Sequence, residues 1–251
     1  MKRTALLAAS VLLALSGATA FAADSVPKAI ADAVADKGRP EADTKRDADR
    51  KPAEVVAFAG IKPGDTVVDI MPGGGYFTRI FAKAVGPKGK VIAVVPEEMM
   101  KTRATAADGV KAIAADPAYA NVIVVETPSI NAIKISAPAD VIWTSQNYHD
   151  FKNKMFGPAD ISAMNKSILA ALKPGGTYIV LDHVAAAGAA NATEELHRID
   201  PAVVKAEVTA AGFKFDSESK VLAHSADDHT GKVFDAGMRG KTDQFIYKFK
   251  K

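Results

Sequence analysis

Short β-branched runs alternate with longer segments through most of this chain, and this alternation limits the possible folds more than any other feature. Five runs are rich in Val, Ile, Leu and Thr: residues 66–70, 91–95, 122–125, 141–144 and 177–181. Such near-continuous apolar strands suit a sheet that is buried on both faces. The segments between them are long enough for crossover helices, so we expect an α/β fold with parallel strands and helices on both faces.

The clearest helix signals lie on either side of the last of these runs. A helical repeat of apolar residues over Asp160–Leu172 predicts a crossover helix. Further on, Asp200 and Pro201 form a good N-cap and first-turn pair, and Gly212 stands where a helix commonly ends. The sequence therefore predicts one helix before the fifth of these strands and another after it.

The C-terminal part departs from the alternation. A strand is predicted over Lys214–Glu218, and a polar stretch over residues 219–242 leads to a last strand marked by Phe245, Tyr247 and Phe249. Two consecutive strands without an intervening helix pair antiparallel most easily. The sheet should therefore be mixed at this end.

The N-terminus has the layout of a secretory signal. Lys2 and Arg3 precede an apolar run over residues 5–15, and Ala20-Phe21-Ala22 forms a small-x-small cleavage site. The run is short for a bilayer span, so we expect cleavage after Ala22, export to the periplasm or the medium, and no stable membrane anchor. We then expect an N-terminal helical extension over residues 23–60 and one domain over 61–251.

The charge balance excludes one class of function. Loss of residues 1–22 removes Lys2 and Arg3 but no acidic residue, so the net charge falls from +3 to about +1. A near-neutral chain lacks the basic surplus of a dedicated nucleic-acid binder. The chain has no cysteine, which excludes disulfides and thiolate metal sites.

The segment over residues 41–50 is rich in charged residues. It is either a solvated linker or helix start, or a cap over a site.

A glycine-rich turn follows the first strand. Asp69 ends the strand region, and Gly73, Gly74 and Gly75 lead into the next helix. Glycines let the backbone approach a ligand closely, and the helix start offers free N–H groups, so we expect a nucleotide-like ligand here. The three glycines are consecutive, which does not fit the spaced glycine pattern of nicotinamide-dependent dehydrogenases.

Together with the Leu172–Gly176 segment, this turn resembles the class I S-adenosylmethionine-dependent methyltransferases. More narrowly, the chain from about Arg46 onward is similar to a group of bacterial methyltransferase-like proteins that carry signal peptides. The resemblance implies a Rossmann-like seven-stranded sheet with an antiparallel last strand, and S-adenosyl-L-methionine as cofactor. It also implies that Asp69 and the Gly73–Gly75 turn border the methionine and ribose parts of that cofactor.

Two positions depart from the family pattern. Met71 stands where the family usually has its first glycine, and Val95 stands where an acidic residue usually binds the ribose hydroxyls. Glu97, two positions later, could replace that acid. If Glu97 points to solvent instead, cofactor affinity is in question.

A group of polar residues is expected at the carboxyl ends of the fourth and fifth strands, where open α/β sheets bind ligands. Asn147, His149 and Asp150 follow the fourth strand, and Asp182 and His183 follow the fifth. We hypothesise that His149 or His183 is the general base, that Asp150 or Asp182 orients an imidazole, and that Asn147 positions cofactor or acceptor. A divalent metal site is the alternative interpretation, although no specific motif supports it.

Other polar residues have two interpretations each. His197 and Arg198 either reach this rim or form a polar lead-in to the next helix, and Arg239 and Lys241 either hold an anionic acceptor or are surface charges. We interpret His224 and His229 as loop residues and do not assign them to the site.

Two functions follow from this pattern. The first is a methyltransferase that transfers a methyl group from S-adenosylmethionine to an unidentified small-molecule acceptor. The second is a non-catalytic exported protein that keeps the fold and binds a nucleoside-like or other small ligand. A charged cofactor made inside cells does not cross a membrane unaided, so the predicted export implies either that a transporter supplies the cofactor or that the fold has another use. The departures at Met71 and Val95 favour the second function, whereas Asp69, Gly73, Gly75 and the histidines favour the first.

Overall fold

The computed structural model describes residues 26–127, 129–154, 159–189 and 191–251. The predicted signal peptide and its cleavage site lie outside these residues. Among the residues that are described, no helix has both the length and the apolar character needed to cross a membrane.

A seven-stranded sheet forms the centre of the molecule, in the order β3-β2-β1-β4-β5-β7-β6. Its strands are β1 (Thr66–Ile70), β2 (Lys90–Pro96), β3 (Val122–Thr127), β4 (Ala139–Ser145), β5 (Leu172–His183), β6 (Lys214–Ser219) and β7 (Gln244–Lys250). Strands β1 to β5 pair in parallel, and β7 runs antiparallel to both β5 and β6. The predicted Rossmann-like mixed sheet with an antiparallel last strand is confirmed.

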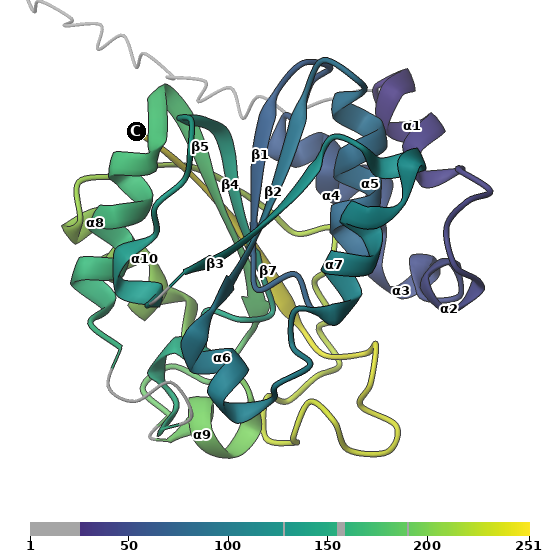
Figure 1. Cartoon of the computed structure of the whole chain (residues 1–251). Coiled ribbons are helices and arrows are strands. Elements are labelled where there is room, and N and C mark those ends of the chain that lie inside the picture. Colours follow the sequence, from purple (N-terminus) through teal and green to yellow (C-terminus); the bar gives the residue numbers. More distant parts are fainter. Residues whose placement is uncertain (1–25, 128, 155–158, 190) are drawn as a thin grey trace, which may run out of the picture.

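Helices cover both faces of the sheet, as expected (Figure 1). One face carries α1 (Lys28–Val34), α4 (Pro52–Ala59), α5 (Tyr76–Val85) and α7 (Asp108–Ala115), and the other carries α8 (Ile161–Ala171) and α10 (Pro201–Ala210). Side chains alternate between two apolar cores: Val67 and Trp143 face the first group of helices, whereas Val68 and Ile142 face the second. Burial on both faces explains why these strands are nearly continuous in apolar residues.

The predicted helix starts are present. The Asp160 side chain accepts a hydrogen bond from the Ala163 amide at 2.9 Å, and Asp200 accepts one from Ala202 at 2.8 Å. These caps satisfy amides that have no partner within the helix. Beyond α10, Gly212 adopts a φ of 112°, which only glycine adopts without strain.

The N-terminal segment shares the core of the sheet. Ile30 in α1 is 1% exposed, and Val55 and Val56 in α4 are fully buried in the same apolar cluster as Ile80 and Phe81 of α5. Residues 26–60 therefore pack as part of the domain and do not stand apart from it.

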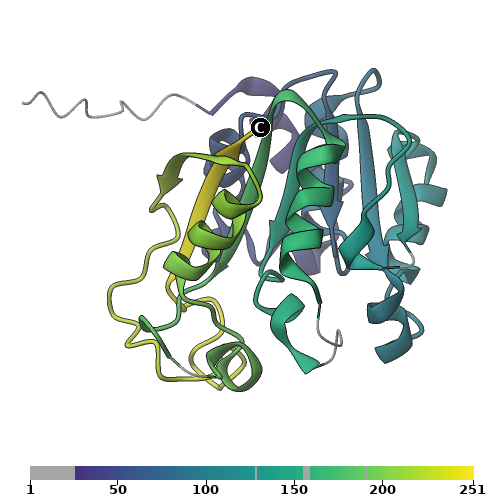
Figure 2. The same cartoon turned by 90° about the vertical axis from the view of Figure 1, so that its left-hand side faces the viewer.

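The remaining elements are short: α2 (Glu41–Thr44), α3 (Asp47–Arg50), α6 (Glu97–Thr102), α9 (Ala192–Leu196) and single 3-10 turns at Pro117–Tyr119, Ile130–Ala132 and Asp150–Lys152. Helices α6 and α9 follow strands β2 and β5 at their carboxyl ends. The long segment between β6 and β7 gathers at the same end of the sheet as α9 (Figures 1 and 2). This end carries all the predicted site residues.

Candidate cofactor and acceptor site

The turn after β1 is held in a left-handed conformation. Met71 has a φ of 54°, Gly73 a φ of 58° and Gly75 a φ of 81°. A left-handed φ explains why glycine is usual at the position of Met71, because a side chain there strains the backbone. Met71 is only 4% exposed and packs in the core with Val68 and Ile70, and this burial offsets the strain.

The three glycines of the turn have different roles. A Cβ atom at Gly75 would lie 2.2 Å from the Ile113 Cδ1 atom, so Gly75 is needed for the packing of α7 against the turn. A Cβ atom at Gly73 or Gly74 would meet nothing within 4 Å. Gly73 and Gly74 therefore leave backbone open to a ligand.

Asp69 lies under this turn and is 3% exposed. The Thr78 hydroxyl donates a hydrogen bond of 2.7 Å to its Oδ2 atom. Burial raises the pKa of Asp69 to about 7, and the Thr78 hydrogen bond and the positive charge of Arg50 only partly oppose this. The Asp69 carboxyl group is thus poised between its neutral and charged forms near neutral pH.

The charge run over residues 41–50 docks on the glycine turn. The Arg79 guanidinium donates to the Gly74 carbonyl at 2.9 Å and to Asp43 at 3.0 Å. Tyr76, the first residue of α5, donates its hydroxyl proton to Asp47 at 2.6 Å. These contacts support the interpretation of the run as a cap.

Arg50, at the end of this cap, was missed by the sequence analysis. Its guanidinium carbon lies 4.5 Å from the ring centroid of Tyr76 and 5.0 Å from that of Phe77, and it donates to the Gln146 Oε1 atom at 3.1 Å. Burial and the neighbouring Arg46 lower its pKa to about 10. Within the described part of the chain, no carboxylate forms an ion pair with Arg50.

Asn147 joins the end of β4 to the same turn. Its side-chain amide donates to the carbonyls of Ile70 and Met71 at 3.3 and 3.1 Å. The preceding residue, Gln146, has a φ of 59° and donates to Gln244 at 2.9 Å. Asn147 therefore holds the strained turn in place, next to the position where the resemblance puts the cofactor.

His149 and Asp182 form a buried pair at the carboxyl ends of β4 and β5. The Nδ1 atom of His149 lies 2.8 Å from Asp182 Oδ1, and the His149 amide donates to Asp182 Oδ2 at 2.9 Å. Burial alone would lower the pKa of His149, but the charges of Asp182 and Asp150 outweigh it and raise the pKa to about 10. In Asp182, burial would raise the pKa, but His149 keeps it below the usual range.

Two further side chains face the other ring nitrogen of His149. Its Nε2 atom lies 3.2 Å from Asp150 Oδ1 and 3.4 Å from His197 Nδ1. The sequence left open whether His197 reaches the rim, and the structure places it there. Arg198, by contrast, points away and pairs with Asp227 at 2.8 Å, with both side chains fully buried.

His183 lies next to this group but faces another partner. Its Nδ1 atom is 2.9 Å from the Thr242 hydroxyl, and its ring centroid is 6.3 Å from that of His149. Burial lowers the pKa of His183 to about 4, against the opposing charge of Asp182, so its imidazole is neutral at physiological pH. The structure thus brings His149, Asp150 and Asp182 together and sets His183 apart.

Glu97 occupies the first position of α6. Its side chain is 47% exposed and lies 3.9 Å from the Lys101 amino group. The neighbouring Glu98 instead turns inward and accepts a hydrogen bond from the Ser129 hydroxyl at 2.7 Å. A ribose-binding role for Glu97 stays a prediction, since the described structure pairs this side chain with a surface lysine.

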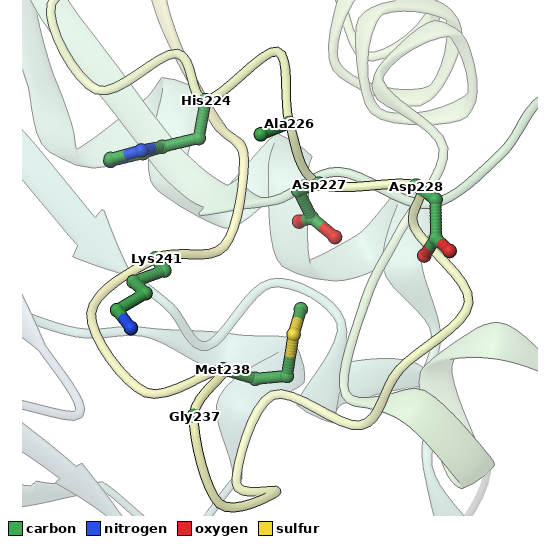
Figure 3. Close-up of a pocket in the computed structure, with 7 residues that line it drawn as sticks. All are labelled: His224, Ala226, Asp227, Asp228, Gly237, Met238 and Lys241. Atoms are coloured by element: carbon green, nitrogen blue, oxygen red, sulfur yellow. The ribbon is translucent and has the colours of Figure 1, made fainter.

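A pocket of about 340 Å³ lies in the long segment before β7 (Figure 3). Its lining residues are His224, Ala226, Asp227, Asp228, Gly237, Met238 and Lys241. Lys241 lines this pocket, whereas Arg239 is exposed and is not part of the lining, so the two cations do not converge. His229 pairs with Asp243 at 3.1 Å, which agrees with its interpretation as a loop residue.

Comparisons with known proteins agree with this architecture. The family model of protein-L-isoaspartate(D-aspartate) O-methyltransferases matches residues 44–156. The ubiquinone/menaquinone biosynthesis C-methyltransferase UbiE of Ectopseudomonas mendocina (strain ymp) is 30% identical over 132 residues, which are 51% of this chain and 45% of the relative. The corresponding UbiE of Pseudomonas paraeruginosa (strain DSM 24068 / PA7) is 29% identical over 131 residues, which are again 51% of this chain and 45% of the relative. The chain therefore spans about half the length of the curated relatives that it matches.

Solved structures extend the likeness to most of the domain. A SAM-dependent methyltransferase from Aquifex aeolicus superposes with a TM-score of 0.56 at 18% identity, covering 78% of this chain and 87% of that chain. The glycopeptide N-methyltransferase MtfA, in complex with S-adenosyl-L-methionine, gives a TM-score of 0.52 at 14% identity. This match covers 78% of this chain and 85% of that chain. The chain thus has the class I fold of S-adenosylmethionine-dependent methyltransferases.

Proposed function

We propose that this protein is an S-adenosylmethionine-dependent methyltransferase that acts on a small-molecule acceptor. The observation that carries the proposal is the position of Arg50 over the rings of Tyr76 and Phe77, at the start of the helix that follows the glycine turn in a methyltransferase fold. A half-buried guanidinium without a carboxylate partner among the described residues is suited to a ligand's carboxylate.

The residues around the turn match the chemistry of the cofactor. S-adenosylmethionine carries a carboxylate, an amino group, a sulfonium and an adenosine. Arg50 would hold the carboxylate, and the open backbone at Gly73 and Gly74 would lie against the amino-acid part. Asp69 would offer carboxyl oxygens below the turn, and Asn147 would keep the turn in its strained conformation.

When bound, the cofactor supplies a methyl group on sulfur that is transferred in one in-line displacement. The protein's share is to align donor and acceptor and to accept a proton where the acceptor carries one. Asp182 fixes the orientation of the His149 ring, but a pKa of about 10 keeps this ring protonated at neutral pH, so His149 would accept a proton only after losing its own. The imidazole of His183 is neutral at this pH, but its ring is turned toward Thr242.

The pocket in Figure 3 is a suitable acceptor site. Its lining residue Asp227 pairs with Arg198, the residue after His197, and Thr242, the residue after Lys241, lies 2.9 Å from His183. Its volume of about 340 Å³ fits a small molecule.

We extend the proposal to an exported protein of the periplasm or the medium, on the N-terminal sequence alone. The non-catalytic alternative is not favoured, since the matched relatives are methyltransferases.

Calorimetric titration of the purified protein with S-adenosylhomocysteine tests the role of Arg50. The Arg50→Gln variant should bind about 10- to 100-fold more weakly, because a charge-assisted hydrogen bond contributes roughly 1.5–3 kcal/mol. The Arg239→Gln variant, which removes an exposed arginine outside the site, should bind like the wild type. Equal affinity of wild type and Arg50→Gln would contradict the proposed cofactor site.

A further inference from the structure

We propose that His149, Asp150 and His197 form a binding site for a divalent transition-metal cation, for which Zn²⁺ is the best match. The three residues come from two separate parts of the chain. His149 and Asp150 follow β4, and His197 follows α9. Three potential ligand atoms, one from each residue, lie close together.

The spacing of the three atoms matches a metal centre. His149 Nε2 lies 3.2 Å from Asp150 Oδ1 and 3.4 Å from His197 Nδ1, and the latter two atoms are 3.7 Å apart. A tetrahedral zinc ion bonded at about 2.0–2.1 Å separates its ligand atoms by about 3.3–3.4 Å. A cation placed among the three atoms can therefore reach all of them without rearrangement of the backbone.

Asp182 prepares His149 for this role. It accepts a hydrogen bond from the Nδ1 side of the ring at 2.8 Å, so Nε2 is the nitrogen that faces Asp150 and His197, and a cation bound there would replace its proton. Metal-binding histidines usually donate their second nitrogen to a carboxylate in this way, and the carboxylate fixes the ring orientation.

The position of His197 is also held by the fold. Its backbone is left-handed, with a φ of 54°, which is uncommon for a residue other than glycine. Its ring packs edge-on against Phe234 at a centroid distance of 4.9 Å, and the Lys154 amide donates to Glu194 of α9 at 3.1 Å. The first contact holds His197 against the segment between β6 and β7, and the second holds α9 against the segment that follows His149 and Asp150.

The ligand set favours particular metals and leaves room for a further ligand. Two imidazole nitrogens and one carboxylate suit zinc and its first-row neighbours, whereas magnesium and calcium prefer oxygen ligands alone. His149 is buried, but the side chains of His197 and Asp150 are 29% and 18% exposed, so the group opens toward solvent on one side. Three protein ligands and an open position are typical of catalytic zinc sites.

The role of the metal rests on the proposed function. An acceptor oxygen in the open position would lose its proton more readily, because a bound cation stabilises the anion. In that case His149 acts as a ligand and leaves acceptor activation to the metal. Metal binding itself does not depend on the cofactor or on methyl transfer.

Zinc titration of the chelator-treated purified protein tests the site, with calorimetry as the readout and no cofactor present. One Zn²⁺ should bind per chain, and His197→Gln and Asp150→Asn should each weaken binding at least 10-fold. Asp182→Asn should weaken it about 10- to 100-fold without abolishing it, as loss of an outer partner does. His197 is part-exposed, so its variant should fold even if substitution of the buried His149 does not.

The control is His224→Gln, which removes a half-exposed histidine from the loop before β7 and should leave zinc affinity unchanged. Substitution with Co²⁺ should give the intense visible bands of a four- or five-coordinate ion, and these bands should be lost in His197→Gln. Zinc binding that survives in both His197→Gln and Asp150→Asn, or that falls equally in His224→Gln, would overturn the proposal. Failure of S-adenosylhomocysteine to bind would overturn only the proposed methyltransferase function.

Discussion

At the scale of single residues, the site combines groups that are costly to bury. Asp69 and Asp182 are almost fully buried carboxyl groups, and each is held by one dominant partner, Thr78 and His149 respectively. Their environments differ in one respect. The His149 charge holds the pKa of Asp182 low, whereas no residue in the described part of the chain forms an ion pair with Asp69, and burial raises its pKa to about 7.

The raised pKa of Asp69 predicts a pH dependence of stability. The unfolded chain loses this proton near pH 4, but the folded chain keeps it up to about pH 7. Between these values the folded state binds more protons, so the contribution of Asp69 to the free energy of unfolding falls as the pH rises from about 4 to about 7. Asp69→Asn, which keeps an acceptor for Thr78 but cannot ionise, should therefore gain about 2–4 kcal/mol relative to the wild type between pH 4 and pH 8.

Urea unfolding of both proteins across this pH range measures the effect, and the difference between them cancels the other titrating groups. An unchanged difference from pH 4 to pH 8 would mean that Asp69 titrates normally and is not buried as described.

Sequence reasoning found the acidic and glycine residues of the site, but it missed Arg50 and left His197 undecided. Arg50 lies in a run of ten mostly charged residues, and the pattern does not show which cation turns inward. Its position depends on Tyr76 and Gln146, which are distant in sequence. The position of His197 depends on a left-handed backbone after α9, for which no local signal exists.

At the scale of elements, periodicity was enough to predict the sheet. Each of the five apolar runs became a strand, because β1 to β5 are covered on both faces. The bounds of β5 differ most: it begins at Leu172, whereas the apolar run begins at Thr177. Residues 173–176 continue the strand through a shift of register against β4, which an apolar pattern does not reveal.

The N-terminal helices are predicted to unfold together with the sheet. Ile30→Ala in α1 should lower the free energy of unfolding by about 2–4 kcal/mol, because Ile30 is 1% exposed and packs in the core. Val203→Ala, at a 38% exposed position of α10, is the matched control and should change stability by less than about 0.5 kcal/mol. Chemical unfolding provides the comparison. A wild-type midpoint in Ile30→Ala would show that α1 unfolds independently of the domain.

At the scale of the whole molecule, four parts of the chain lie at one end of the sheet. They are the charged segment 41–50, the glycine turn, the cluster of His149, Asp150 and His197, and the long segment before β7. A Cβ atom at Gly240 would lie 2.6 Å from Asp49, and Lys51 donates to the Val221 carbonyl at 2.8 Å. Residues 49–51 and the long segment between β6 and β7 therefore meet near the carboxyl ends of the strands, where open α/β sheets bind ligands.

Thermal unfolding of the purified protein with S-adenosylmethionine or S-adenosylhomocysteine tests the proposed cofactor site most directly. A ligand at about 100 times its Kd stabilises a protein by about 2.7 kcal/mol, which raises the Tm of a domain of this size by roughly 5–10 °C. We predict this rise with both ligands and no rise with adenosine monophosphate or NAD. No rise in Tm with either ligand at millimolar concentration would contradict the methyltransferase function proposed for this protein.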